Sequence, residues 1–155
     1  MDILNFPNYS FRFKNSENIR EIFDPIRKKF VVLTPEEWVR QHTLAYLMQE
    51  KQMPKTLINV ERKIIIYGVP KRYDIVVHYP NGSICLLVEC KAPNVIINQE
   101  VFDQIAQYNL SLKADMLMVT NGLNHYFCSL DYHHKTYRFL KSLPSYSFPI
   151  ISKWK

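Results

Sequence analysis

The sequence predicts an α/β domain in which a mixed sheet of about five strands is flanked by two helices. Three observations support this prediction. The chain has 155 residues, of which 47% are hydrophobic and 22% charged, which is enough for one sizeable core. Two segments have apolar residues at helical spacing, and runs of strand character lie between and after them. No repeat or linker interrupts the chain, so we expect residues 1–155 to form a single domain.

The first helix is predicted to begin at Pro35 and to end near Gln52. Thr34 is a suitable N-cap, and Glu37 stands three residues later, as in a capping box. A second helix is predicted from about Asn98 to Leu112, where apolar residues recur at intervals of three and four.

Strands are predicted wherever short apolar or alternating runs end at turn residues. The run at 84–90 is nearly all apolar, as expected for a central strand that is buried on both faces. Residues 1–30 form an N-terminal extension, with a short strand or extended arm at 9–14, and residues 144–155 form an extended tail. The remaining predicted strands are Leu57–Tyr67, Arg72–Tyr79, Met116–Thr120, Tyr126–Leu130 and Thr136–Phe139.

The composition narrows the function classes. A formal net charge of +6 is compatible with a polyanionic partner, although the tightest basic cluster, Arg27 to Lys29, is expected to be a solvated surface. Three glycines are too few for a glycine-rich phosphate loop. Three cysteines without a close pair fit a reducing compartment, and no signal peptide or long apolar segment is visible, so we expect a cytoplasmic protein without membrane contact.

The informative residues lie at the end of the predicted central strand. Glu89 and Lys91 are two residues apart, so on a strand their side chains share a face at about 6–7 Å. Asp74 lies on the preceding strand, about as far before the connecting turn as Glu89 lies after it. A hairpin would therefore bring Asp74 beside Glu89. An isolated Glu89 and Lys91 would be more simply explained as an ion pair, and it is Asp74 that favours a site.

Two carboxylates and a lysine at one place suit the hydrolysis of a phosphodiester bond. Hard oxygen ligands favour Mg²⁺ or Mn²⁺, and the backbone carbonyl of Cys90 could be a further ligand. Such a cation polarises phosphate and activates water, and the Lys91 ammonium could stabilise the developing negative charge.

These residues resemble the core of the PD-(D/E)XK nucleases. Asp74 is followed after fourteen residues by Glu89-Cys90-Lys91-Ala92-Pro93, and the resemblance extends over residues 34–122. The chain is similar to the N-terminal nuclease domain of type I restriction enzyme R subunits. The shared features include the acid-bearing first helix, Arg72-Tyr73-Asp74, Gln104 with Tyr108, and Val119-Thr120-Asn121-Gly122. Tyr73 stands where the family has a proline.

The resemblance implies a restriction-endonuclease-like fold and a Mg²⁺-dependent endonuclease acting on DNA. Asp74 and Glu89 would bind the metal and Lys91 would assist catalysis, while Glu37 would either join the metal site or complete the capping box. Gln104, Tyr108 and Arg72 would contact DNA or support the site. A homodimer or a larger restriction or repair complex is the expected assembly, and R subunits carry a motor after this domain, so 155 residues predict a stand-alone domain without one.

Other interpretations stay open at this point. His125 with Cys128, and the pair His133 and His134, could suggest zinc, although their spacing is not that of known zinc sites. Cys90 with a histidine could imitate a thiol hydrolase. The late aromatics could stack on single-stranded bases but are more simply packing residues; with their basic neighbours they are Tyr126, Tyr132, Tyr137, Arg138 and Lys141. The same fold could also serve as a DNA- or partner-binding module without catalysis, or as an interaction protein that binds no nucleic acid.

Overall fold

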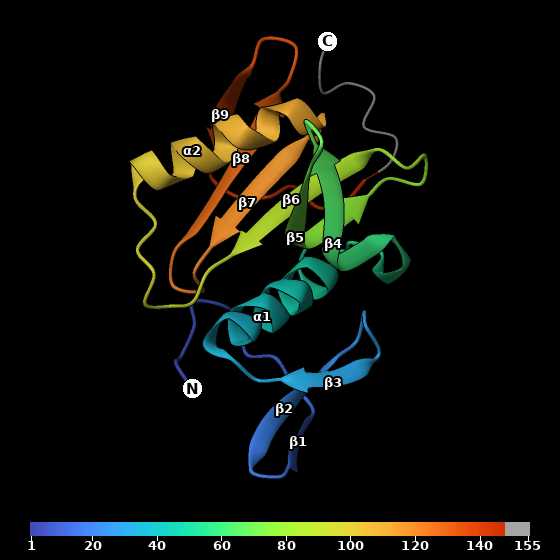
Figure 1. Ribbon diagram of the computed structural model, residues 1–155, viewed down its shortest axis with the longest axis vertical. Coiled ribbons are helices and arrows are strands. Elements are labelled where there is room, and N and C mark those ends of the chain that lie inside the picture. The colour runs from blue at the N-terminus through green and yellow to red at the C-terminus, as the bar shows by residue number, and fades with distance from the viewer. Residues whose placement is uncertain (148–155) are drawn as a thin grey trace.

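The computed structural model describes residues 1–147 and contains a central sheet of six strands, in the order β4-β5-β6-β7-β8-β9 (Figure 1). β6 and β7 are parallel, whereas the other neighbouring pairs are antiparallel, so the sheet is mixed as predicted. The strands are β4 (Ile58–Ile66), β5 (Val69–His78), β6 (Ile84–Cys90), β7 (Met116–Thr120), β8 (His125–Asp131) and β9 (Thr136–Leu140).

A helix covers each face of the central sheet (Figure 1). α1 (Pro35–Gln49) packs Val39, Leu44 and Leu47 against the face that carries Ile75 and Val88. α2 (Gln99–Asn109) packs against the opposite face, and the short helix η2 (Leu110–Leu112) extends it. The buried α2 residues Phe102 and Ala106 pack against alternate positions of β6 and β7. These strand residues are Leu87, Leu117 and Val119. Because both faces are covered, β6 and β7 are buried along almost their whole length.

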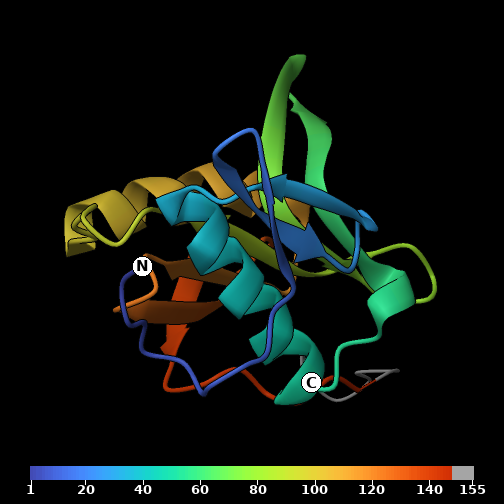
Figure 2. The same cartoon turned by 90° about the horizontal axis from the view of Figure 1, so that it is seen from below.

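A second sheet precedes α1 and was not anticipated as such. It is a meander of β1 (Phe13–Ser16), β2 (Ile19–Asp24) and β3 (Lys29–Val32). Glu17 and Asn18 form the first turn with positive φ angles, a conformation that asparagine tolerates better than most residues. Figure 2 shows this sheet lying near α1, and side-chain contacts from Asp24 and Arg27 join it to that helix.

One predicted boundary was wrong for a local reason. Of the short strand or extended arm expected at 9–14, only the part from Phe13 onward is a strand, whereas α1 ends at Gln49 rather than near Gln52. At the helix end the Met53 N–H donates to the Leu47 carbonyl at 3.0 Å, and Gln52 has a φ of 57°. This left-handed residue reverses the chain direction, so the apolar spacing near 48 does not continue as a helix.

The end of β6 is held by its parallel neighbour. The Lys91 N–H donates to the Thr120 carbonyl at 2.8 Å, which extends the pairing of β6 with β7 by one residue. Gly122 follows β7 with a φ of 86°, and a Cβ there would lie 2.8 Å from the Leu4 side chain. The Asn5 N–H donates to the Gly122 carbonyl at 2.7 Å, so the N-terminal segment is fixed beside this edge of the sheet.

A short η1 helix (Lys55–Leu57) leads into β4. Within residues 1–147, no helix combines the length and the apolar character that crossing a membrane would require. Of the tail predicted at 144–155, residues 148–155 lie outside the described part of the chain.

Candidate functional site

The hairpin of β5 and β6 has the register that the sequence suggested. Ile75 is paired with Val88, so Asp74 and Glu89 are each the next residue along their strands. On the other side of β6, Glu89 is paired with Val119. The structure therefore places Asp74 and Glu89 on neighbouring strands near the same end of the sheet, with Lys91 one residue beyond the end of β6.

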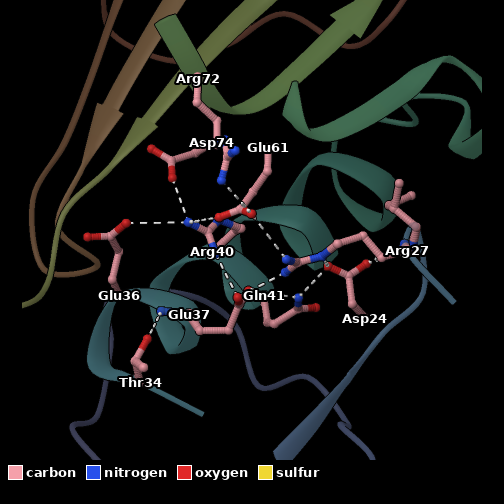
Figure 3. Close-up of polar contacts among 11 residues, drawn as sticks. Asp24, Arg27, Thr34, Glu36, Glu37, Arg40, Gln41, Glu61, Arg72 and Asp74 are labelled. Carbon is pink, nitrogen blue, oxygen red and sulfur yellow. Dashed lines mark hydrogen bonds and ion pairs between the residues drawn. The ribbon is translucent and has the colours of Figure 1, made fainter. Parts of the chain in front are cut away.

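Both oxygens of Asp74 have partners. Oδ1 accepts a hydrogen bond from Arg40 Nη2 at 2.7 Å (Figure 3). Oδ2 accepts one from the Cys90 N–H at 2.7 Å. The second bond ties the carboxylate directly to the backbone of β6. Asp74 is consequently held in one orientation between α1 and the central strand.

Arg40 on α1 is the centre of a largely buried ion-pair network. Its side chain is 6% exposed and also contacts Glu37 Oε1 at 2.6 Å and Glu61 Oε1 at 3.4 Å. Burial alone would lower the pKa of Arg40, but the hydrogen bond that Arg40 donates to Asp74 and the charges of Glu37 and Asp74 raise it well above its usual value. Arg40 is therefore a permanent cation that neutralises Asp74.

The network continues into the second sheet. Arg27 donates to Glu37 at 2.9 Å and to Asp24 at 2.7 Å, and Gln41 bridges the same two carboxylates at 3.1 and 3.0 Å (Figure 3). Asp24 is fully buried. The expectation that Arg27 belongs to a solvated surface was thus wrong, since its side chain is only 18% exposed.

Glu37 was predicted either to join the metal site or to complete a capping box. Thr34 does cap α1, because its Oγ1 accepts a hydrogen bond from the Glu37 N–H at 3.0 Å. The Glu37 carboxylate does not return to the Thr34 N–H, which donates to the Val32 carbonyl instead. It contacts Arg27, Arg40 and Gln41, so only half of the capping box forms.

Glu89 is paired with a different cation. Lys71 Nζ lies 2.8 Å from Glu89 Oε1, and the Glu89 side chain is 10% exposed. That oxygen has no hydrogen bond of favourable angle, so it is a buried acceptor whose neighbour is a charge rather than an aligned donor. Lys71 Nζ also lies 4.5 Å from the centre of the Tyr108 ring and 5.0 Å from that of Tyr73.

The remaining predicted residues take different positions. Tyr108 contacts Lys71, whereas Gln104, one turn earlier on α2, is exposed. The Arg72 side chain is 58% exposed and approaches Glu61 at 3.8 Å. Lys91 is half-buried, and its charge lowers the pKa of Glu36, although burial and the charge of Asp74 raise that pKa on balance. Lys91 therefore lies within electrostatic reach of the residues around Asp74.

An open cavity of about 530 Å³ lies beside Arg40. Three carboxylate residues line it, but neither Asp74 nor Glu89 is among its lining residues. Its lining consists of Val31, Val32, Thr34, Pro35, Glu36, Glu37, Arg40, Glu61 and Ala92.

Asp74 and Glu89 suit a hard divalent cation on the condition that their present cationic partners, Arg40 and Lys71, give way. Within the described residues, no three His, Cys, Asp or Glu side chains group closely enough to hold a metal by themselves. Mg²⁺, however, is often held by one or two carboxylates together with water and substrate phosphate. The buried Glu89 Oε1 is suited to such a role, but Arg40 and Lys71 would first have to release at least one oxygen of each acid.

The other candidate sites find less support. In residues 1–147, His125 is engaged by Thr120 and the Asn5 carbonyl, and His134 by Asp131, and no zinc-like group forms. Burial raises the pKa of Cys90, which disfavours a reactive thiolate. Tyr126 and Tyr137 pack against the core beside α2.

Sequence reasoning missed the cations. Arg40 is three residues after Glu37 on α1, which is the spacing of a helical ion pair and could have indicated it. Lys71 carries no comparable signal, because its contact with Glu89 depends on how separate elements pack. The same holds for the contact of Arg27 with Glu37, although Arg27 also pairs locally with Asp24, three residues earlier.

Comparison with known families gives a match over most of the chain. The family described as type I restriction enzyme R protein N terminus (HSDR_N) matches residues 35–144. The matched range includes Asp74, Glu89 and Lys91 and excludes the three-stranded sheet. No curated protein matches the chain significantly.

Proposed function

We propose a nuclease function from one premise: this chain belongs to the family of type I restriction enzyme R protein N-termini. The proposed activity is Mg²⁺- or Mn²⁺-dependent endonucleolytic hydrolysis of DNA phosphodiester bonds, on a fold of the restriction-endonuclease type. The observation that carries it is the placement of Asp74 and Glu89 at adjacent positions of paired strands, with Lys91 directly after them.

Each residue has a proposed role. Asp74, Glu89 and the Cys90 carbonyl would hold the cation. When bound, the cation supplies the charge that polarises the phosphate and eases deprotonation of a water molecule. Lys91 stabilises the negative charge that develops on the phosphate oxygens. Glu37 is too firmly bound by Arg27 and Arg40 to be a preferred ligand.

Arg40 and the Cys90 N–H act as positioning groups. They hold the Asp74 carboxylate from two sides, so its orientation is fixed before a cation arrives. Before a cation binds, Arg40 neutralises Asp74 and Lys71 neutralises Glu89, which limits the repulsion between these carboxylates.

The decisive test combines metal binding with cleavage. Mn²⁺ is titrated by calorimetry into the wild type, Glu89→Gln and Glu100→Gln, and plasmid cleavage is measured on the same samples. Glu100 is an exposed carboxylate in the first turn of α2 and serves as the matched control. We expect binding and cleavage in the wild type and in Glu100→Gln, and loss of both in Glu89→Gln. Cleavage by Glu89→Gln at the wild-type rate would refute the assignment.

A non-catalytic DNA- or partner-binding module is the second candidate. It is favoured by the fact that both acids already have cationic partners. It predicts that the wild type binds no Mn²⁺ and cuts nothing, while DNA affinity, if DNA is the partner, falls steeply with salt. A homodimer or a larger restriction complex would be compatible with either function, because cutting two strands commonly needs two sites.

A further inference from the structure

A second cavity, of about 300 Å³, lies at the C-terminal end of α2. Residues of the turn between β4 and β5, of the C-terminal end of α2 and of the turn between β8 and β9 line it. Figure 1 shows where these three segments lie in the fold. Its lining consists of Tyr67, Gln107, Tyr108, Leu110, Ser111, Lys113, Tyr132 and Lys135.

The lining has the chemistry of a nucleotide site. It includes three tyrosines and two lysines, and no carboxylate is among the lining residues. Aromatic rings stack on bases, lysines attract phosphate, and the amide of Gln107 can donate to and accept from a base edge. An apolar ligand would not require the lysines, and a free phosphate would not require the rings.

The position of Tyr67 supports a binding role. Its side chain is 89% exposed, so it contributes little to the core. Its φ is 49° and Gly68 follows with 74°, a two-residue hairpin turn in which asparagine is favoured over tyrosine. Neither packing nor turn geometry therefore accounts for an aromatic residue at this place.

The cavity is connected to the candidate active site through one side chain. The Tyr108 ring lines the cavity and is 4.5 Å from Lys71 Nζ, which is 2.8 Å from Glu89 Oε1. A strand with one base in the cavity would thus continue past Lys71 toward Glu89. Lys71 could then exchange its carboxylate for a phosphate of that strand.

We propose that this cavity binds an unpaired nucleotide of single-stranded DNA, with the base between Tyr67, Tyr108 and Tyr132 and the phosphates on Lys113 and Lys135. The proposal rests on the nuclease function in that it names the substrate class of that site. It gives the enzyme a preference for DNA with an unpaired segment next to the cleaved bond.

The test measures binding without catalysis. A fluorescent oligothymidine and a duplex of equal length are titrated with protein in EDTA, and fluorescence anisotropy is recorded at several salt concentrations. The variants are Tyr67→Asn, Tyr132→Ala, Lys113→Asn and Lys135→Asn. Asparagine suits three of these positions, because Tyr67, Lys113 and Lys135 all have positive φ angles. Lys28→Asn is the matched control, since Lys28 is exposed, has a φ of 56° and lies in the second sheet's turn.

We expect each tyrosine variant to bind oligothymidine roughly five- to 150-fold more weakly, the range for loss of one stacked base. Each lysine variant should lower the slope of log affinity against log salt by about 0.7, the value for one phosphate contact on a single strand. Lys28→Asn should bind like the wild type, and no pocket variant should lose duplex affinity to the same extent.

Unchanged binding of oligothymidine by the tyrosine variants would overturn the proposal, as would an equal loss of duplex and single-strand affinity. A wild type that binds oligothymidine no more tightly than duplex would overturn it too. These results are separable from failure of the nuclease function. Selective binding of oligothymidine without any cleavage in Mg²⁺ supports the proposed cavity site and refutes the nuclease function. If the wild type cleaves DNA and the cavity variants bind oligothymidine as tightly as the wild type, only the cavity proposal is refuted.

Discussion

Replacing Arg40 with alanine tests whether the ion-pair network stabilises the fold. The Arg40 side chain is 6% exposed and donates to Asp74 at 2.7 Å and to Glu37 at 2.6 Å. Its removal leaves two carboxylates in a largely buried place without their nearest cation. We expect Arg40→Ala to be among the most destabilising single substitutions outside the apolar core.

The magnitude follows from the number of bonds lost. A hydrogen bond to a charged group contributes about 1.5–3 kcal/mol, so two such bonds give roughly 3–6 kcal/mol. Breaking a buried ion pair by removing one partner costs about 3–5 kcal/mol, which agrees. For a chain of this size that corresponds to a melting temperature lower by about 6–20 °C.

Urea denaturation followed by circular dichroism measures the effect, with Arg72→Ala as the matched control. Arg72 also contacts Glu61, at 3.8 Å, but its side chain is 58% exposed. An exposed pair contributes only about 0–1 kcal/mol, so the same chemical change should have little effect there. If Arg40→Ala loses no more stability than Arg72→Ala, the network is not a buried, cooperating unit and the reasoning is refuted.

Further predictions concern catalysis, packing and pH. Lys91→Ala should lower the cleavage rate about 10²-fold or more while Mn²⁺ binding persists in calorimetry, and loss of Mn²⁺ binding would contradict an electrostatic role. Tyr73→Phe should lower the free energy of unfolding by about 1–3 kcal/mol, measured by urea denaturation. The reason is that the buried Asn109 Oδ1 accepts a hydrogen bond from the Tyr73 hydroxyl at 2.5 Å and would lose its donor. An unchanged urea midpoint would count against this prediction. Desolvation lowers the pKa of His125 below 6.5, despite a raising contribution from its hydrogen bond with the Asn5 backbone. As pH falls, the unfolded chain therefore binds a proton at this histidine before the folded chain does. Stability should fall as pH drops from about 6.5 toward the folded pKa. His125→Gln should flatten that part of the stability curve, and an equally steep curve would argue against it. No cysteine should react with a thiol reagent at pH 8 in the native protein, since Cys85, Cys90 and Cys128 are buried and burial raises the pKa of Cys128 to about 12.

The structure also changes how the acids should be mutated. Asp74→Ala would be the simplest test of the proposed metal ligand. Because Asp74 accepts from Arg40 and from the Cys90 N–H, its truncation would also remove a partner of a buried cation. Glu89→Gln is the cleaner probe of the site, since it keeps the shape of the side chain.

Local patterns were sufficient for much of the fold. The strands at 84–90 and 116–120 agree residue for residue with the structure, because nearly continuous apolar runs bounded by turn residues leave little choice of register. The Thr34 cap was likewise predicted from the sequence, since a side chain that caps a helix acts within three residues. The hairpin register that brings Asp74 next to Glu89 followed from the short turn between two recognisable strands.

The sequence by itself determined the order of elements, the central strands and the neighbourhood of Asp74, Glu89 and Lys91. Only the tertiary structure decided that Arg40 neutralises Asp74, that Lys71 neutralises Glu89, and that Tyr67, Tyr108 and Tyr132 surround one cavity. Periodicity and capping act over a few residues along the chain and can be read from it. The ion pairs of Arg40 with Asp74 and of Lys71 with Glu89, and the tyrosine-lined cavity, join separate elements of the chain, so their partners depend on how helices and sheets pack.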